Sequence, residues 1–254
     1  MKIGIMGAIP QEVDLMRQEM EVEEEVLLGG RTFYVGTLHG CDVVLVFSRI
    51  GKVAAASVAT TLFNLFGIDF LLFIGVAGAV HSELEIGDIV IGAKLYQHDM
   101  DGRPLFPKFE VPLTGRDHFF TEEEYLRCAE ACVADFINEL EEHVDQKILE
   151  SFSIDVPKII CGTIATGDQF ISDPADHVNM VLSEESAHAV EMEGAAVAQI
   201  CHEYHKPCLI IRTISDRADH SAAVDFQKFI ESISNPFSQG IVRKLLPELV
   251  KIIK

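Results

Sequence analysis

Short apolar runs that alternate with helical segments constrain the fold of this 254-residue chain more than any other feature. Residues 70–74 and 208–211 are continuously apolar, which is typical of strands covered on both faces of a sheet. Strands that alternate with helices indicate an α/β fold. Further strands are predicted at residues 2–6, 87–96 and 158–164, and helices from near Pro10 and at 53–66, 121–150 and 194–204.

The predicted sheet is mixed rather than purely parallel, because residues 32–38 and 42–47 resemble a β-hairpin around His39 and Gly40. We therefore predict a three-layer αβα fold, with a central twisted mixed β-sheet flanked by helices. Nothing in the sequence resembles an interdomain linker, so residues 1–254 are expected to form a single domain. The acidic residues 21–25 are expected to be a short connection, and the C-terminal helical segment is expected to break at Pro236 and Pro247.

Composition excludes several partners. A net charge of −20 repels nucleic acid and anionic membrane surfaces. The longest apolar run, residues 70–80, is too short to span a bilayer, and the first residues do not resemble a secretory signal. Six cysteines without a C-x-x-C pair indicate reduced thiols and a cytoplasmic protein. The histidines show no metal-ligand spacing, so we expect no metal.

Charged side chains lie where predicted strands end. Arg212, Ser215 and Asp216 follow the apolar run 208–211, and ligands of open α/β sheets bind at strand carboxyl ends. Glu12 follows the first strand in the same way. Glu191 and Glu193 precede the helix 194–204. Acids in the first turn of a helix also stabilise its dipole by ~0.3–1 kcal/mol, so a purely structural role stays open for Glu12, Glu191 and Glu193.

Two other segments suggest ligand contact. Gly75 and Gly78 let the backbone approach a ligand closely, although the segment matches neither a G-x-G-x-x-G motif nor a P-loop, and a tight structural turn explains it equally well. The connection 97–113 is long for a compact domain. A loop of this length usually binds something or reaches a partner subunit.

Six short segments carry a family resemblance in order along nearly the whole chain: residues 7–12, 50–55, 75–78, 167–171, 190–193 and 212–216. Together they resemble the bacterial 5′-methylthioadenosine/S-adenosylhomocysteine nucleosidases of the nucleoside phosphorylase family. The resemblance implies a cofactor-free hydrolase that releases adenine from these nucleosides, with 5′-deoxyadenosine as a further candidate substrate. It also implies a homodimer in which the loop 97–113 reaches the neighbouring site.

The resemblance also implies roles for individual residues. Asp216 would protonate the adenine at N7, and Glu12 would take a proton from the attacking water. Such an acid must keep its proton at neutral pH, although an ordinary aspartate has a pKa of ~3.9, so Asp216 is expected to be desolvated. The remaining residues are expected to bind the substrate: Ala8, Ile9, Ile50, Val76, Ala77, Gly78, Gln169, Phe170, Ile171, Glu191, Met192, Glu193, Arg212, Ser215 and Phe226.

Within that set, Glu193 would hold the ribose hydroxyls with Met192 against the sugar, and Arg212 would help to position the water. Phe170 would stack on the base, whose edge the Ile171 backbone would read. Ala77 and Gly78 would line the base pocket, and Phe226 would border the 5′ substituent.

Departures from related families bear on the nucleophile and the substrate. Phosphorolytic relatives bind phosphate with arginines, whereas this chain has Phe73 and Ile74 before the glycine turn and Glu12 in the first helix. Water is therefore the expected nucleophile, and a phosphorylase is the alternative. Many nucleosidases have a serine where this chain has Val76, so substrate preference stays open and includes 6-amino-6-deoxyfutalosine. A nucleoside-binding storage protein is a non-enzymatic alternative, but it would have no use for both Glu12 and Asp216.

Overall fold

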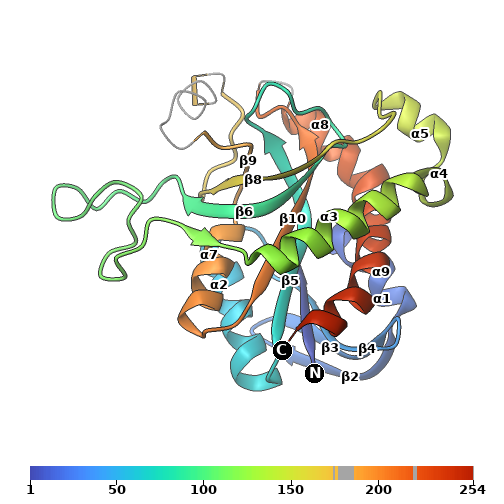
Figure 1. Cartoon of the computed structure of the whole chain (residues 1–254), viewed down its shortest axis with the longest axis horizontal. Coiled ribbons are helices and arrows are strands. Elements are labelled where there is room, and N and C mark those ends of the chain that lie inside the picture. The colour runs from blue at the N-terminus through green and yellow to red at the C-terminus, as the bar shows by residue number, and fades with distance from the viewer. Residues whose placement is uncertain (174, 177–185, 220–221, 254) are drawn as a thin grey trace.

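The computed structural model describes residues 1–173, 175–176, 186–219 and 222–253. Within this part of the chain a mixed ten-stranded sheet forms the centre of the molecule (Figure 1). Its strands are β1 (Ile3–Gly7), β2 (Glu21–Leu28), β3 (Arg31–Leu38), β4 (Cys41–Phe47), β5 (Phe70–Ala79), β6 (Ile89–Gln97), β7 (Phe119–Phe120), β8 (Ile159–Thr166), β9 (Ala189–Glu191) and β10 (Cys208–Asp216).

Helices cover both faces of this sheet. They are α1 (Asp14–Glu19), α2 (Lys52–Thr61), α3 (Glu123–Asn138), α4 (Leu140–His143), α5 (Gln146–Ser151), α7 (Gly194–Glu203), α8 (Ala222–Phe229) and α9 (Asn235–Ile252). A 3-10 turn, η1 (Pro10–Glu12), precedes α1, and π-helical turns η2 (Leu62–Phe66) and η3 (Ile230–Ser234) follow α2 and α8.

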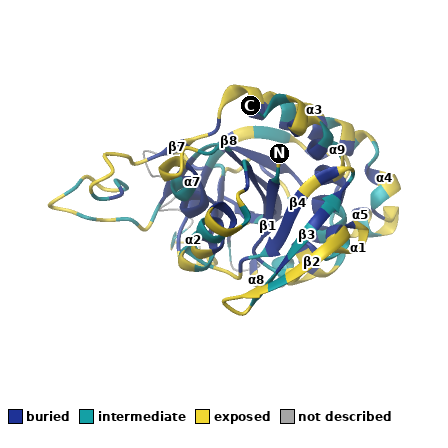
Figure 2. Ribbon diagram, turned by 90° about the horizontal axis from the view of Figure 1, so that it is seen from below, coloured by how far each residue is buried: buried dark blue, intermediate teal, exposed yellow. Residues whose placement is uncertain are grey.

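Alternate residues of β5 divide the core into two layers. Leu72 and Ile74 pack in one cluster with α1, α3 and α9, whereas Leu71 and Phe73 pack in the other with α2 and α7. Figure 2 shows α3 and α9 on one side of the buried strands and α2 and α7 on the other. The predicted three-layer αβα fold is therefore confirmed.

Pairing within the sheet goes beyond the open arrangement that the sequence suggests. Strand β5 pairs with both β9 and β10, β10 pairs with β6, and β6 pairs with β8, which in turn pairs with β9. These five strands form a closed circuit, while β1, β4, β3 and β2 extend from it as an ordinary sheet. The order of strands along the sequence gives no direct sign of this closure.

Two local predictions are wrong. Residues 21–25 belong to β2, an edge strand antiparallel to β3, and its exposed position lets several glutamates point into solvent. Pro247 lies inside α9, whereas Pro236 lies in its first turn, where a proline needs no backbone N–H. The break expected at Pro247 is absent because α9 buries an apolar face along most of its length, which offsets the one backbone hydrogen bond that proline removes.

None of the helices in the described ranges is long and apolar enough to cross a membrane.

Candidate active site

The candidate site lies where the edge of β5 passes from one partner strand to another. Strand β10 follows one edge of β5, and the other edge pairs with β1 at residues 70–73 and with β9 at residues 78–79. Between these two pairings, the carboxylate of Glu12 accepts a hydrogen bond from the Val76 N–H at 3.1 Å. A side chain thus takes the place of a strand partner at this point.

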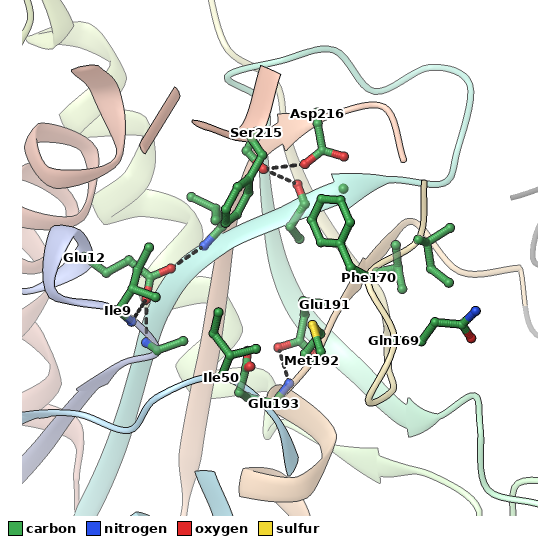
Figure 3. A pocket seen from close by; sticks show the side chains of 17 residues that line it. Ile9, Glu12, Ile50, Gln169, Phe170, Glu191, Met192, Glu193, Ser215 and Asp216 are labelled. Atoms are coloured by element: carbon green, nitrogen blue, oxygen red, sulfur yellow. Dashed lines mark hydrogen bonds between the residues drawn. The ribbon is translucent and has the colours of Figure 1, made fainter. Parts of the chain in front are cut away.

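A pocket of about 340 Å³ opens over this gap (Figure 3). Its walls come from the loop after β1, the start of α2, the end of β5, the loop after β8, the β9–α7 junction, the end of β10 and α8. The lining residues are Ala8, Ile9, Glu12, Ile50, Val76, Ala77, Gly78, Gln169, Phe170, Ile171, Val190, Glu191, Met192, Glu193, Ser215, Asp216 and Phe226.

The structure brings together all of the predicted site residues except Arg212. Among the described residues, the one lining residue that sequence reasoning missed is Val190. It lies in β9, which is only three residues long and therefore too short to show a strand period. The signal that could have identified Val190 is its position directly before Glu191 and Glu193, where an inward-facing apolar residue can form a pocket wall.

Backbone donors hold Glu12 in place. Its carboxylate accepts from the Ala8 N–H at 2.5 Å and the Ile9 N–H at 3.2 Å, in addition to Val76. The turn η1, which starts at Pro10, brings this buried side chain back towards its own strand. Burial raises the pKa of Glu12, against the opposing effects of the Arg212 guanidinium and the three N–H groups. A raised pKa makes the carboxylate a better general base near neutral pH.

Asp216 lies on the opposite side of the pocket from Glu12 (Figure 3). Its Oδ2 accepts a hydrogen bond from Ser215 Oγ at 2.7 Å, and its Oδ1 accepts from the Ala218 N–H at 2.9 Å. The side chain is almost completely buried, and burial raises the pKa of Asp216 although the two donors oppose the shift. A carboxyl group with a raised pKa is suited to donating a proton into the pocket.

Strand β5 sets the distance between the two acids. Glu12 contacts β5 at Val76, and Asp216 is in register with Gly78. The two positions on β5 are two residues apart, which is roughly 7 Å along the strand. Gly75 and Gly78 make room for the two acids, because a Cβ on Gly75 would lie 2.6 Å from Glu12 Oε1 and one on Gly78 would lie 2.9 Å from Asp216 Oδ1.

Glu191 and Arg212 form a buried ion pair below the pocket. Arg212 Nη2 lies 2.8 Å from Glu191 Oε2, and the guanidinium also stacks on the Phe73 ring, with 4.1 Å from Cζ to the ring centroid. The same Glu191 oxygen accepts from the Gly194 N–H at 2.7 Å. Glu191 therefore serves the start of α7, as the helix-dipole interpretation predicts. Arg212 lies behind the lining residues rather than among them.

Because Glu191 is paired with Arg212 and the start of α7, Glu193 is the member of the two glutamates that faces the pocket. Its Oε1 accepts a hydrogen bond from the Gly51 N–H at 2.7 Å. Burial, followed by the neighbouring Glu191 carboxylate, raises the pKa of Glu193 to about 8. Met192 lies beside it, and Ile50 closes the same side of the pocket (Figure 3).

Aromatic side chains form the opposite wall. The rings of Phe170 and Phe226 meet edge to face, with 5.6 Å between their centroids. Phe170 is 43% exposed, which leaves part of its ring free to stack on a flat ligand. Ile171 is buried beside it, and Gln169 lies at the rim.

The charges that line the pocket have one sign. Among the described lining residues the ionisable groups are Glu12, Glu191, Glu193 and Asp216, all of them acids. Those of them that are ionised repel phosphate and stabilise positive charge that develops on a bound ligand. The site therefore fits the cleavage of a glycosidic bond through a cationic sugar, with an acid at the leaving group and a base at the incoming water.

Fold and site together define a nucleoside phosphorylase-like protein with a hydrolytic type of site. A model of the phosphorylase superfamily matches residues 2–247. The chain belongs to the phosphorylase superfamily and, within it, resembles the nucleosidases, which are N-glycosyl hydrolases.

Two curated relatives and one solved structure illustrate the similarity. The 5′-methylthioadenosine/S-adenosylhomocysteine nucleosidase of Bacillus thuringiensis (strain Al Hakam) is 34% identical over 249 residues, which cover 98% of this chain and 100% of the relative. The aminodeoxyfutalosine nucleosidase of Helicobacter pylori (strain J99) is 33% identical over 249 residues, covering 98% and 99%. A 5′-methylthioadenosine/S-adenosylhomocysteine nucleosidase from Colwellia psychrerythraea 34H in complex with adenine superposes with a TM-score of 0.85, at 30% identity and with coverage of 98% and 96%.

Proposed function

We propose that this protein hydrolyses the N-ribosidic bond of 5′-methylthioadenosine and S-adenosylhomocysteine, releasing adenine and the 5-substituted ribose. The observation that carries the proposal is that Glu12 and Asp216, two buried acids with raised pKa values, face one pocket from opposite sides. No cofactor is needed for this chemistry. A role in methionine salvage in the cytoplasm follows from the proposed substrates.

In the proposed mechanism, Asp216 donates its proton to N7 of the adenine as the bond to the sugar lengthens. The base leaves as a neutral group, and positive charge collects on the ribose. Water on the other side of the sugar gives a proton to Glu12 and attacks the anomeric carbon. Each proton transfer by a placed group is worth about 10²–10⁴ in rate.

The other lining residues bind the substrate in this proposal. Glu193 holds the ribose hydroxyls, with Met192 against the sugar face. Phe170 stacks on the base, and the backbone of Ile171 meets its edge. The acid lining supports the cationic sugar, and the buried Arg212 acts through Glu191 and Glu12 rather than by touching the nucleoside.

Water is the proposed nucleophile because the lining offers phosphate no cationic partner among the described residues. A phosphate group would instead meet the ionised base Glu12 at close range, which is electrostatically unfavourable. This point separates the nucleosidase proposal from a phosphorylase.

A second candidate substrate is 6-amino-6-deoxyfutalosine, which shares the adenine and ribose groups. The observation in its favour is that a relative named for this activity and one named for methylthioadenosine match the chain at nearly the same identity, 33% and 34%. These substrates differ at the 5′ end, where Phe226 and Ile9 give the pocket an apolar border.

We further propose a homodimer. Residues 98–118 extend from the body of the molecule as an arm (Figure 1). Its Leu105 and Leu113 are 83% and 91% exposed, although large apolar side chains are usually covered. An arm of this kind is suited to covering the 5′ end of a neighbouring pocket.

The proposal is tested by measuring adenine release from 5′-methylthioadenosine, S-adenosylhomocysteine, aminodeoxyfutalosine and adenosine, each with and without phosphate. We expect release from the first two at a rate independent of phosphate, with free 5-substituted ribose as the second product. Formation of a ribose 1-phosphate would instead identify a phosphorylase. If none of the four substrates releases adenine, the protein is a nucleoside-binding protein rather than an enzyme.

A further inference from the structure

Three charged residues outside the pocket lining form a closed ring at its rim. Lys52 Nζ lies 2.6 Å from Asp99 Oδ1, the Asp168 N–H donates to Asp99 Oδ2 at 3.0 Å, and the Lys52 N–H donates to Asp168 Oδ1 at 2.8 Å. These residues come from the start of α2, the loop after β6 and the loop after β8. The ring therefore joins segments that are far apart in the sequence.

The start of α2 is where this ring meets the pocket. Ile50 lines the pocket, the Gly51 N–H holds Glu193, and the next N–H, that of Lys52, holds Asp168. Asp168 thus supplies the carboxylate that the first turn of α2 lacks in its own sequence, a favourable position at a helix N-terminus. Gly51 has φ +101, a conformation that favours glycine and that turns both N–H groups towards these acids.

Asp168 also controls the opposite wall, because Gln169, Phe170 and Ile171 follow it directly. Its side chain is held by Lys52 and its backbone by Asp99. The same Lys52 ammonium lies 3.2 Å from Gln97 Oε1, at the end of β6 where the arm begins. The ring consequently connects the wall carrying Phe170, the carboxylate of Glu193 and the root of the arm.

We propose that Lys52, Asp99 and Asp168 are positioning residues, which hold the segment 169–171 at a fixed distance from Glu193 so that one nucleoside contacts both. This inference rests on the proposed function and deepens it. Opening the ring should leave the acids Glu12 and Asp216 in place, since neither contacts it. Substrate binding should therefore weaken more than the chemical step.

The test compares Asp168→Ala, Asp99→Asn and Lys52→Met with the wild type by steady-state kinetics on 5′-methylthioadenosine. We expect KM to rise roughly 3- to 10-fold, the size of losing one or two partly exposed hydrogen bonds, while kcat falls less than about 3-fold. The double variant Lys52→Met/Asp99→Asn should raise KM no more than either single variant, because each substitution opens the same ring. Lys52→Arg, which keeps the charge, should restore part of the KM.

Lys244→Met is the matched control. It breaks the Lys244–Glu139 ion pair, which has a similar length and exposure (2.5 Å; 27% and 41%) to the Lys52–Asp99 pair (2.6 Å; 17% and 29%) but lies between α9 and the end of α3. KM should be unchanged in this variant. An equal rise in KM in Lys244→Met, or an unchanged KM in Asp168→Ala with its fold intact, would overturn the proposal.

A second measurement separates failure of this inference from failure of the proposed function. The chain has no tryptophan, so Phe170→Trp introduces a single fluorophore on the segment in question. Without any ligand, the anisotropy of this tryptophan should fall when Asp168→Ala is added and should stay constant when Lys244→Met is added. Constant anisotropy in both would reject the ring as a positioning device, whichever substrate the enzyme uses.

Discussion

Gly75 lies directly against the carboxylate of Glu12, and a Cβ at this position would be 2.6 Å from Glu12 Oε1. The residue is in an ordinary extended conformation within β5, so it is the space and not the backbone angle that requires glycine here. The fit between these two residues places the proposed base at the edge of the strand. It also predicts that a larger residue at position 75 moves the carboxylate of Glu12.

Gly75→Ala should displace the Glu12 carboxylate and lower adenine release at least 10-fold, because about 1 Å of misplacement is costly in a catalytic group. Gly4→Ala is the matched control. Its Cβ would also meet an atom at 2.6 Å, but that atom is the end of the flexible Ile68 side chain rather than a proposed catalytic group. Comparable losses of activity in the two variants would contradict a specific role for Gly75. Circular dichroism and thermal melts check the folding of both.

Asp216→Asn and Glu12→Gln should each lower kcat by about 10²–10⁴, since each removes one proton transfer. Neither changes the volume of a buried side chain appreciably, so both proteins should remain folded. Single-turnover adenine release at saturating 5′-methylthioadenosine is the measurement. Turnover close to the wild-type rate in either variant would remove that residue from its proposed role.

The raised pKa of Glu193 predicts that folding stability falls as pH rises. The group ionises near 4.5 in the unfolded chain and near 8 in the folded protein, so between these values the folded state binds more protons. The free energy of unfolding therefore decreases across this interval and levels off above it. Glu193→Gln should show a shallower decrease in urea melts recorded from pH 5 to 8. Parallel profiles for the two proteins would show that Glu193 titrates at its ordinary pKa in the folded state.

Removing the positive member of the buried Glu191–Arg212 pair should be strongly destabilising. In Arg212→Met the almost completely buried Glu191 carboxylate loses its counter-charge, which costs about 3–5 kcal/mol. Arg127→Met breaks the exposed Arg127–Glu123 pair and should cost less than about 1 kcal/mol. Urea denaturation gives both values. The double variant Glu191→Gln/Arg212→Met should recover part of the loss, and a larger loss would argue against the pair as the cause.

Charge on the arm should weaken the proposed dimer. Leu105→Glu and Leu113→Glu place an acid where the apolar side chain is expected to contact a second copy. We expect a shift from dimer to monomer in sedimentation velocity, together with lower adenine release. Leu27→Glu, on the edge strand β2 and 72% exposed, is the control and should leave both unchanged. A wild-type chain that sediments as a monomer would reject the dimer outright.

The sequence predicted those parts of the fold that depend on local patterns. Apolar runs located β5 and β10, and the polar residues after them located Asp216 and Ser215 at the correct edge of the sheet. Glu12 could be found in the same way, because a proline-started turn follows the first strand. These features need only the nearest neighbours in the chain.

The parts that could not be predicted depend on pairing between distant segments. Arg212 follows an apolar run just as Asp216 does, and only the three-dimensional contacts place it behind the pocket against Glu191. Asp168 gives no sign in the sequence that it completes the first turn of α2. Residues 21–25 became a strand because β3 supplied hydrogen bonds to them, which their own composition does not indicate.

The exchange of partners along β5 links catalytic competence to the order of assembly. Residue 12 reaches this strand from the start of the chain and residue 216 from near its end, so strands must pair with both edges of β5 before both acids are in place. A refolding chain should regain its helical signal first and its turnover last, when β10 pairs with β5.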